Sequence, residues 1–309
     1  MRILIELPTW LGDAVMATPA IENLANFQNE VEITIIGSFA SIEVLKNHQK
    51  VVKTVVLDKK YPSLVKISRE LGSFESFFSF RSAYRSKFLK LLVSAKNKYQ
   101  FNKDQYNNCH QVEKYNNFVN NCLGLNLPAG KLIIHPNLRL LNNNSAPIVG
   151  INPGASYGSA KRWYPKEFAE VASELSTHYE IIIIGGPDER DIAADIEKSL
   201  VDKGVTNYKN LVGITTIQEL ISLISTLDLF ITGDSGSMHI AASFQVPTVA
   251  IFGPTRDDET SQWKNDKSII VKKDLDCQPC MKRNCPLKHH NCMNLIKAVD
   301  VLKAVRSLG

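Results

Sequence analysis

The sequence predicts an α/β protein made of two domains, each with a doubly wound parallel sheet, and three observations support this. Short β-branched segments alternate with helical segments. The alternation restarts near residue 146, after a polar stretch that ends in proline. Several strand segments are apolar along their whole length, as expected for strands buried on both faces of a sheet. The 309 residues, 44% of them hydrophobic and 22% charged, suffice for two folded domains.

The first domain is expected to cover residues 1–145. It opens with a β-branched strand at 2–7, followed by a loop through Gly12 and a helix that begins at Asp13. The further elements expected here are strands at 31–36 and 51–57 with a helix from Phe39 between them.

The second domain is expected to cover residues 146–309, after a linker at 142–147. Two such domains would place a cleft between the carboxyl ends of their sheets, and the final helix could pack back on the first domain. The expected strands are 148–152, 180–184, 229–232 and 246–252, and the expected helices are 165–175, 216–225 and 237–244.

Charge and hydropathy limit the cellular compartments and the classes of binding partner that we expect for this protein. The formal net charge of +5 suits an anionic substrate or membrane surface and does not require nucleic acid. Glu6, Pro8 and Asp13 interrupt the first apolar stretch, which argues against a signal peptide. No apolar run approaches the roughly 20 residues of a membrane-spanning helix. We therefore expect a soluble cytoplasmic protein without a transmembrane segment.

One segment, 81–103, carries seven cations and no acid. It is either a solvated helix whose apolar stripe faces the core, or a surface that meets anionic lipid headgroups or acceptor phosphates.

The motif at residues 8–13, PTWLGD, places a glycine and an acid where a strand hands over to a helix. Asp13 could cap the helix, because aspartate is a favoured N-cap residue. It could also be a general base that takes a proton from an attacking hydroxyl.

A second motif, residues 152–156, follows a strand and leads to Lys161 and Arg162. Small residues and two adjacent cations form a plausible anion site, although the spacing is not that of a P-loop. The alternative is a surface loop with solvated cations.

The third motif, residues 233–239, reads GDSGSMH between a strand and a helix. Gly236 lets the backbone approach a ligand, while Ser235, Ser237 and the helix N–H groups can hold phosphate. Asp234 would then pair with a sugar hydroxyl or a nearby cation, and His239 could donate to a phosphate oxygen. The alternative is helix capping with a packed histidine.

The sequence lacks two motifs that are typical of cofactor and metal sites. No G-x-G-x-x-G follows a strand, which argues against a dinucleotide dehydrogenase. No Asp-x-Asp pair is placed to hold a metal on a pyrophosphate, so we expect no metal and no cofactor, with Lys161, Arg162 and a helix end stabilising the leaving group.

Four cysteines, at 277, 280, 285 and 292, stand close together near two histidines. The first pair has the C-x2-C spacing of zinc sites, but the second pair does not. Reduced structural thiols and a small zinc loop both remain possible, and catalysis by this cluster is not expected because it lies outside both sheet patterns.

Together these motifs resemble the bacterial heptosyltransferases of glycosyltransferase family 9. The most specific pieces are residues 8–21, 152–165 and 233–242, and the cysteine segment favours type II members over type I. Tyr164 is inserted before Pro165, and Ser237 stands where leucine is common. Residues 63–131 match weakly, and acceptor specificity should reside there.

The resemblance implies a GT-B fold, two facing Rossmann-like domains with the acceptor on the first and the donor on the second. It implies metal-independent, inverting transfer from ADP-heptose to the inner core of lipopolysaccharide at the cytoplasmic face of the membrane. Asp13 matches the catalytic base, with Thr9, Trp10 and Gly12 on the acceptor side.

The resemblance also assigns the donor site. Lys161 and Ser156 match positions beside the donor phosphates, and Asp234 lies near the heptose hydroxyls with Gly236 under the pyrophosphate. Thr215 lines the adenine pocket, and Glu189 approaches the ribose. The donor-binding residues expected overall are Ser156, Lys161, Arg162, Glu189, Thr215, Asp234, Ser235, Gly236, Ser237 and His239.

Three alternatives stay open at this point. Another member of the family could use a different acceptor. A non-catalytic nucleotide-binding module would bind ADP without moving a sugar. A sugar-nucleotide epimerase of related architecture would convert the donor with no acceptor present.

Overall fold

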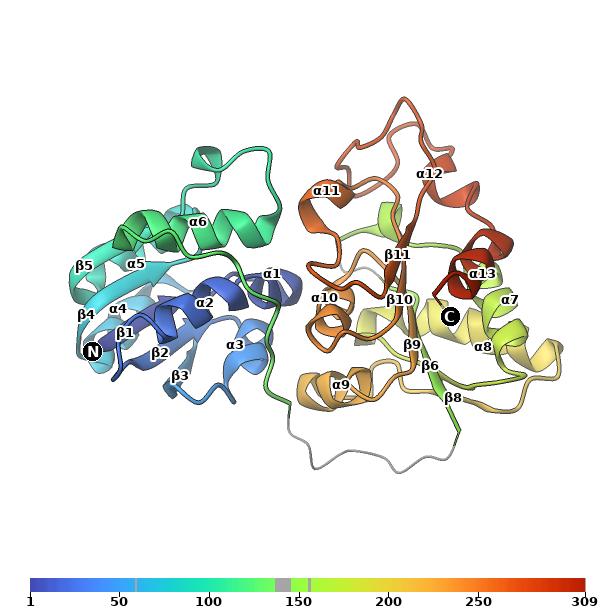
Figure 1. The fold of residues 1–309 in the computed structure, drawn as a ribbon, viewed down its shortest axis with the longest axis horizontal. Coiled ribbons are helices and arrows are strands. Elements are labelled where there is room, and N and C mark those ends of the chain that lie inside the picture. Colours follow the sequence, from blue (N-terminus) through green and yellow to red (C-terminus); the bar gives the residue numbers. More distant parts are fainter. Residues whose placement is uncertain (59, 137–145, 155–156, 309) are drawn as a thin grey trace. The chain divides into compact units, whose positions relative to one another are not determined.

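The computed structural model describes residues 1–58, 60–136, 146–154 and 157–308 (Figure 1). The chain divides into two compact units, Met1–His135 and Pro136–Gly309. The first unit therefore ends before the predicted boundary at residue 145, and most of the stretch between the two positions lies outside the described residues. Each unit contains one parallel sheet, which confirms the predicted α/β class.

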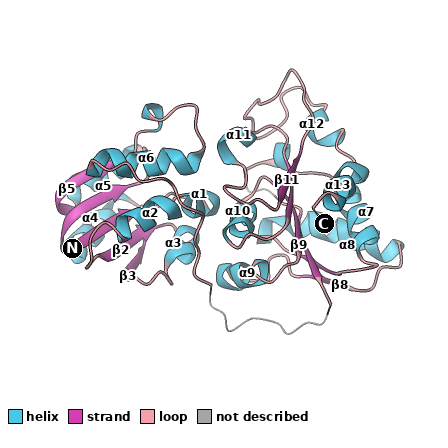
Figure 2. Ribbon diagram, in the orientation of Figure 1, coloured by secondary structure: helices cyan, strands magenta, loops and turns pink. Residues whose placement is uncertain are grey.

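The first unit has a five-stranded sheet in the order β3-β2-β1-β4-β5, with parallel neighbours throughout. β1 is central, and its Ile3, Leu4 and Ile5 are fully buried. Figure 2 shows these strands running between helices. The elements are β1 (Arg2–Glu6), α1 (Leu11–Met16), α2 (Thr18–Ala25), β2 (Glu32–Gly37), α3 (Phe39–Leu45), β3 (Val51–Val56), α4 (Tyr61–Leu71), β4 (Ser73–Ser79), α5 (Tyr84–Leu92), β5 (Ser94–Gln100), η1 (Lys103–Gln105) and α6 (Gln111–Leu123).

The second unit has a six-stranded sheet in the order β11-β10-β9-β6-β7-β8, again parallel. Its core includes Trp163, Phe168 and two isoleucines of β7, Ile181 and Ile183. The elements are β6 (Ile148–Asn152), η3 (Ser159–Lys161), α7 (Pro165–Leu175), β7 (Glu180–Ile183), η4 (Pro187–Glu189), α8 (Arg190–Asp202), β8 (Tyr208–Asn210), α9 (Ile217–Ile224), β9 (Leu229–Gly233), α10 (Gly236–Ser243), β10 (Thr248–Ile251), α11 (Asp257–Thr260), β11 (Ser268–Val271), α12 (Asn291–Asn294) and α13 (Ala298–Arg306).

Both sheets reverse their strand order beside the first strand of the unit. β1 lies between β2 and β4, and β6 lies between β7 and β9. In open α/β sheets, ligands bind outside the carboxyl ends of the strands at this switch point. The three motifs singled out in the sequence follow β1, β6 and β9. The fold therefore places each of them at the switch point of its own sheet.

Most of the predicted elements are confirmed, and β6 and α7 have the predicted bounds. The helix expected from Asp13 begins earlier, at Leu11, and is interrupted at Ala17. The interruption has a local cause: Pro19 has no N–H to donate to the preceding turn, so it stands in the first turn of a new helix, α2, which begins at Thr18.

The basic segment 81–103 is divided between a helix and a strand, so the interpretation as a solvated helix whose apolar stripe faces the core applies only to its first part. It forms α5, then the sheet-edge strand β5, with Leu89 of α5 buried. Lys96 and Lys98 lie on β5, and charged residues on an edge strand discourage pairing with another chain.

The last helix, α13, packs on α7 and on β11, inside the second unit. No helix in the described part of the chain is long and apolar enough to cross a bilayer.

Candidate functional site

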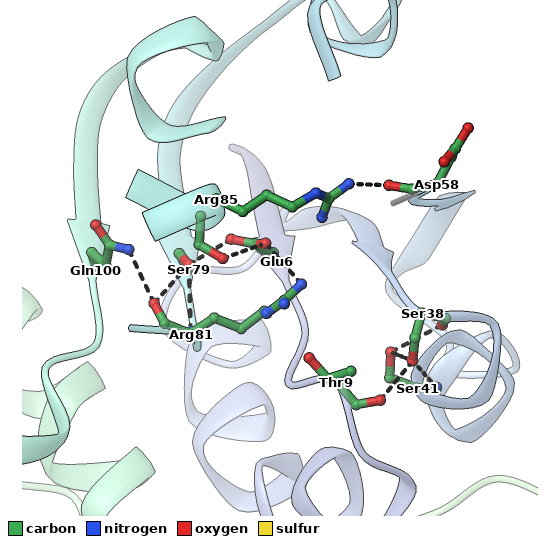
Figure 3. A network of polar contacts seen from close by, with 10 residues as sticks. Glu6, Thr9, Ser38, Ser41, Asp58, Ser79, Arg81, Arg85 and Gln100 are labelled. Carbon is green, nitrogen blue, oxygen red and sulfur yellow. Dashed lines mark hydrogen bonds and ion pairs between the residues drawn. The ribbon is translucent and has the colours of Figure 1, made fainter. Parts of the chain in front are cut away.

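The end of β1 is fixed by a buried carboxylate. Glu6 is fully buried and accepts hydrogen bonds from Ser79 Oγ at 2.6 Å and Ser86 Oγ at 2.8 Å (Figure 3). Arg81 Nη1 lies 3.4 Å from the same carboxylate. Burial raises the pKa of Glu6, while the two hydroxyls and the nearby guanidinium groups oppose that rise. The network ties β1, β4 and α5 together at the switch point.

The loop after β1 is held by a second contact. Ser38 Oγ, at the start of α3, donates to the Thr9 carbonyl at 2.8 Å (Figure 3). Thr9 and Trp10 are exposed, and Trp10 begins α1 as its N-cap without a side-chain cap bond. The exposed loop is the part of this unit that we assigned to the acceptor, and Gly12 follows inside α1.

Asp13 is the third residue of α1 and not its N-cap, so the capping interpretation is wrong. Its carboxylate forms a side-chain hydrogen bond with Tyr115 of α6. Burial raises the pKa of Tyr115 well above its ordinary value, and the Asp13 carboxylate adds to that rise. An acid at the switch point with a neutral phenol beside it has the composition of a general-base site.

In the second unit, the motifs after β6 and β9 meet. Lys161 Nζ lies 2.5 Å from Asp234 Oδ2, and both side chains are largely buried. Thr255 Oγ1, from the loop after β10, donates to the same oxygen at 2.6 Å. The partner of Asp234, predicted as a sugar hydroxyl or a nearby cation, is therefore Lys161 in this structure. A lysine bound to one carboxylate can still direct its other N–H bonds to a phosphate.

An aromatic residue supports the lysine. Lys161 Nζ lies 4.9 Å from the ring centroid of Tyr157, and Arg283 lies 5.3 Å from the same centroid. Arg283 belongs to the cysteine segment, and its carbonyl accepts from Ala160 N at 3.0 Å. The cysteine segment thus packs behind the lysine loop.

The inserted tyrosine has a structural role at the same place. Tyr164 is the N-cap of α7, and its hydroxyl lies 3.1 Å from His290 Nδ1. The other ring nitrogen of His290 lies 2.9 Å from the Ala160 carbonyl. The departure from the family motif therefore joins the lysine loop to the cysteine segment.

The turn after β9 leads directly into α10. Ser235 is the N-cap, Gly236 is the first helical residue, and Ser237 and His239 are buried. Ser235 Oγ lies 3.1 Å from Thr232 Oγ1 rather than on the helix backbone. The Ser235 side chain makes no cap bond to the helix, so the first N–H groups of this eight-residue helix are not capped by their own N-cap residue at the switch point.

The Glu189 side chain lies beside the glycines that follow β6 and β7, Gly154 and Gly185. It is 6% exposed and accepts from Gly186 N at 2.7 Å. A Cβ built on Gly154 would lie 1.8 Å from the Glu189 carboxyl, so the side chain passes directly over that loop. Burial raises the pKa of Glu189, while the Gly186 N–H and the Arg162 charge oppose the rise.

Two further residues predicted for the donor site, Thr215 and Ser156, are not among the contacts described above. Thr215 is partly buried in the loop before α9, and that loop is tied to α8 by Arg190 Nη2, which donates to the Gly213 carbonyl at 2.7 Å. Ser156 lies outside the described residues. The structure thus joins Lys161 with Asp234, which begins the turn into α10.

Two clusters contain residue types that can ligate a metal ion. Among the described residues, one group brings three candidate ligand atoms within 4.8 Å of one another: Glu22, His48 and His135. His48 Nδ1 accepts from Lys50 N at 3.1 Å, so its Nε2 carries the proton that faces Glu22 at 2.9 Å. Nε2 then has no lone pair for a metal, and the group is better described as a hydrogen-bonded histidine.

The four cysteines of the C-terminal segment line one small cavity of about 20 Å³ together with His289 and His290. Burial and the neighbouring thiols raise the pKa of Cys292 to about 11. This set does not bring three ligand atoms within 4.8 Å of one another, although all its residues are described. Cys292 belongs to the core of the unit, while Cys277, Cys280 and Cys285 are half-buried and Cys285 Sγ accepts from His290 N at 3.4 Å.

The sequence analysis assigned no role to three residues at these sites: Thr255, Tyr157 and Tyr115. Thr255 follows the strand predicted at 246–252, so the rule that ligands bind at strand carboxyl ends could have indicated it. The other two are recognisable only from their tertiary contacts.

Comparison with known proteins gives a consistent result. The sequence model described as glycosyltransferase family 9 (heptosyltransferase) matches residues 79–291. The chain is 40% identical to lipooligosaccharide heptosyltransferase 2 of Campylobacter jejuni serotype O:2 over 315 residues, covering all of this chain and 98% of that protein.

Solved structures share the fold. The E. coli ADP-heptose lipopolysaccharide heptosyltransferase II superposes with a TM-score of 0.82 at 19% identity, covering 100% of this chain and 98% of the other. A second E. coli heptosyltransferase, solved with ADP, has a TM-score of 0.78 at 14% identity and full coverage of both chains. At these identities the likeness concerns the fold, two parallel-sheet α/β domains.

Proposed function

Because the chain belongs to glycosyltransferase family 9, the heptosyltransferases, we propose that it transfers L-glycero-D-manno-heptose from ADP-heptose to the heptosyl-Kdo–lipid A inner core of lipopolysaccharide, with inversion. The 40% identity over the full length to a lipooligosaccharide heptosyltransferase 2 supports this acceptor. A sugar-nucleotide epimerase or a non-catalytic nucleotide-binding module is disfavoured by the same likeness. A different acceptor within the family remains the alternative that an acceptor panel distinguishes.

The Lys161–Asp234 contact beside the start of α10 carries the donor-site proposal. Lys161 and the first N–H groups of α10 supply positive charge at the switch point, where a pyrophosphate can be held. Asp234 would accept from heptose hydroxyls, with Thr255 fixing its carboxylate. Glu189 is placed to accept from ribose hydroxyls, and Thr215 would border the adenine.

The acceptor side is proposed to be the loop after β1. Thr9, Trp10 and Gly12 would border the acceptor heptose, and the Asp13 carboxylate would take the proton of its attacking hydroxyl. The hydroxyl oxygen forms a bond to the anomeric carbon as the bond from that carbon to the β-phosphate oxygen breaks. ADP leaves with the electron pair of the broken bond, and the configuration at the anomeric carbon inverts.

Departure of ADP is proposed to depend on the protein's own charges. Lys161, Arg162 and the α10 N–H groups would stabilise the negative charge that develops on the β-phosphate. The charge of Arg162 opposes the burial-raised pKa of Glu189, which supports a role for both residues in the same part of the donor site. We therefore propose a reaction that proceeds without a divalent metal.

The acceptor is a lipid, and α5 offers a candidate membrane contact. Tyr84 and Leu91 on this helix are 85% and 77% exposed, and Lys87 lies beside the Tyr84 ring. Exposed apolar side chains among cations are typical of surfaces that touch anionic headgroups. We propose that this cytoplasmic enzyme binds the inner face of the inner membrane through α5.

The test is ADP release from ADP-heptose in excess chelator, with and without mono-heptosylated Kdo–lipid A. Acceptor-dependent release would support the transferase, the acceptor and the metal independence together. Release without acceptor, with conversion of the donor sugar, would favour an epimerase. Donor binding without release on any inner-core acceptor would overturn the proposed acceptor, and absence of donor binding would overturn the donor site.

A further inference from the structure

We infer that Tyr115 is a positioning residue for the Asp13 base, holding its carboxylate by a hydrogen bond from the buried phenol. This inference rests on the proposed function, because it assigns a role to a residue that acts through Asp13. It names a specific contact between α6 and α1 that the motif at residues 8–13 does not contain.

The position of Tyr115 is fixed by its own helix and by the core. It lies in α6, which packs against α1 and α2, and only 4% of it is exposed. Its ring centroid lies 5.5 Å from that of Phe80 and 5.1 Å from that of Phe101. A phenol held by such ring contacts has one orientation, so its hydroxyl reaches a defined point on Asp13.

The direction of the hydrogen bonds follows from the chemistry of the groups. A carboxylate only accepts, so the Tyr115 hydroxyl donates to Asp13. Gln111, one helical turn before Tyr115, forms a side-chain hydrogen bond to the same hydroxyl, and its amide donates to the phenol oxygen. Burial first, and then the Asp13 charge, keep the pKa of Tyr115 raised, so the phenol remains a donor at neutral pH.

The hydrogen bond from Tyr115 would affect both the orientation and the ionisation of the Asp13 carboxylate. A carboxylate has about four acceptor positions, so a bond from Tyr115 is compatible with one from a substrate hydroxyl. The phenol stabilises the charged, proton-accepting form of the base. Tyr115 would therefore keep the base ionised and aligned at the pH of the reaction, without touching substrate.

The experiment is Tyr115→Phe, which keeps the ring contacts and removes the hydroxyl. Loss of a donor to the carboxylate favours its protonated form, so the acid limb of the pH profile of kcat/KM should move up by about one pH unit. At neutral pH, kcat should fall roughly tenfold while KM for ADP-heptose stays unchanged, because donor binding resides in the second unit.

Tyr106→Phe is the matched control. Tyr106 is also a buried tyrosine, 8% exposed, and its ring stacks on Phe101 at 5.7 Å. Its hydroxyl contacts Asn121 rather than Asp13. This variant should show the same loss of thermal stability as Tyr115→Phe and no shift of the acid limb. Should Tyr115→Phe fail to fold, Gln111→Met is the second variant and should shift the limb in the same direction by less.

The outcomes separate the inference from the function. An unshifted acid limb in folded Tyr115→Phe, with Asp13→Asn inactive, would overturn the role of Tyr115 and leave the base assignment standing. A shift of equal size in Tyr106→Phe would also overturn it, because the effect would then be structural. Full activity of Asp13→Asn would instead contradict the proposed base.

Discussion

Lys161 Nζ lies 2.5 Å from Asp234 Oδ2, although the two residues follow different strands, β6 and β9. The contact exists because these strands are neighbours at the switch point of the second sheet. An ion pair this shielded from solvent leaves an uncompensated charge when one partner is removed. The lysine should therefore serve the donor in two ways, by attracting phosphate and by neutralising Asp234.

Lys161→Ala should weaken ADP binding by about 10- to 100-fold, the usual cost of losing a hydrogen bond to a charged group. The double variant Lys161→Ala/Asp234→Asn should recover part of the lost ADP affinity, because it has no unpaired carboxylate to repel the pyrophosphate. Isothermal titration calorimetry gives the ADP affinity of Lys161→Ala, of Asp234→Asn and of the double variant. Strictly additive losses in the double variant would contradict a coupling between the two residues.

Asp13→Ala should abolish heptosyl transfer and leave ADP affinity unchanged, since the carboxylate is proposed to act only on the acceptor hydroxyl. ADP release with acceptor and ADP binding without it are the two measurements. Loss of ADP binding in this variant would count against the assignment of the base. Glu22→Gln, a partly buried acid on the adjacent helix α2, is a suitable control and should retain transfer.

Glu6→Gln should change how stability depends on pH. Burial raises the pKa of Glu6 above 4.5, so the folded state favours its protonated form. The wild type should therefore lose stability relative to Glu6→Gln as pH rises from about 4.5 through the folded pKa. Thermal denaturation of both proteins across this range gives the difference in Tm.

Glu75→Gln is the control of opposite sign for this experiment. Arg2 N donates to Glu75, and the pKa of Glu75 is lowered from 4.5. Its ionised form is favoured by folding, so the wild type should gain stability relative to Glu75→Gln as pH rises through the lowered pKa to about 4.5, and the denaturation series for this control extends below pH 4.5. The same trend in both variants would mean that the Glu6 environment does not penalise its charge.

Gly154→Ala should disturb the donor site through Glu189. The new Cβ would lie 1.8 Å from the Glu189 carboxyl carbon, so that side chain must move. Overpacking of this kind costs about 1–3 kcal/mol. We expect a lower Tm and weaker ADP binding. Gly130→Ala, where no atom lies within 4 Å of the added Cβ, should leave both unchanged.

Leu91→Glu should reduce binding to vesicles that contain anionic lipid, because it places a negative charge on the exposed side of α5. Co-sedimentation with and without anionic lipid is the measurement. Ile214→Glu is a matched control, since Ile214 is 67% exposed and belongs to the other unit of the chain. Equal loss in both variants would mean that net charge, and not α5, governs the association.

The four central strands of the second unit, β6, β7, β9 and β10, could be predicted because each is a continuous apolar run bounded by glycine or proline, whereas β8, β11 and α8 were not predicted. β4 was not predicted: its sequence SFESFFS mixes serine with phenylalanine and carries no β-branched residue. Ser79 at its end faces Glu6, so a residue that favours turns in a sequence is used here as a buried donor. The strand β5 within the basic segment was not predicted for a related reason. A high density of charged residues indicates exposure to solvent, but it does not distinguish an exposed helix from an edge strand.

By itself, the sequence determined the fold class, the family and the three motifs that follow β1, β6 and β9, because hydrophobic periodicity and strand-to-helix turns are local properties of the chain. Tertiary structure alone decided which side chains meet. Lys161 and Asp234 contact because the strands before them are adjacent, and Tyr115 bonds Asp13 because α6 packs on α1. Such pairs are separated by many residues in the chain, and the packing of the sheet and its helices is what brings them together.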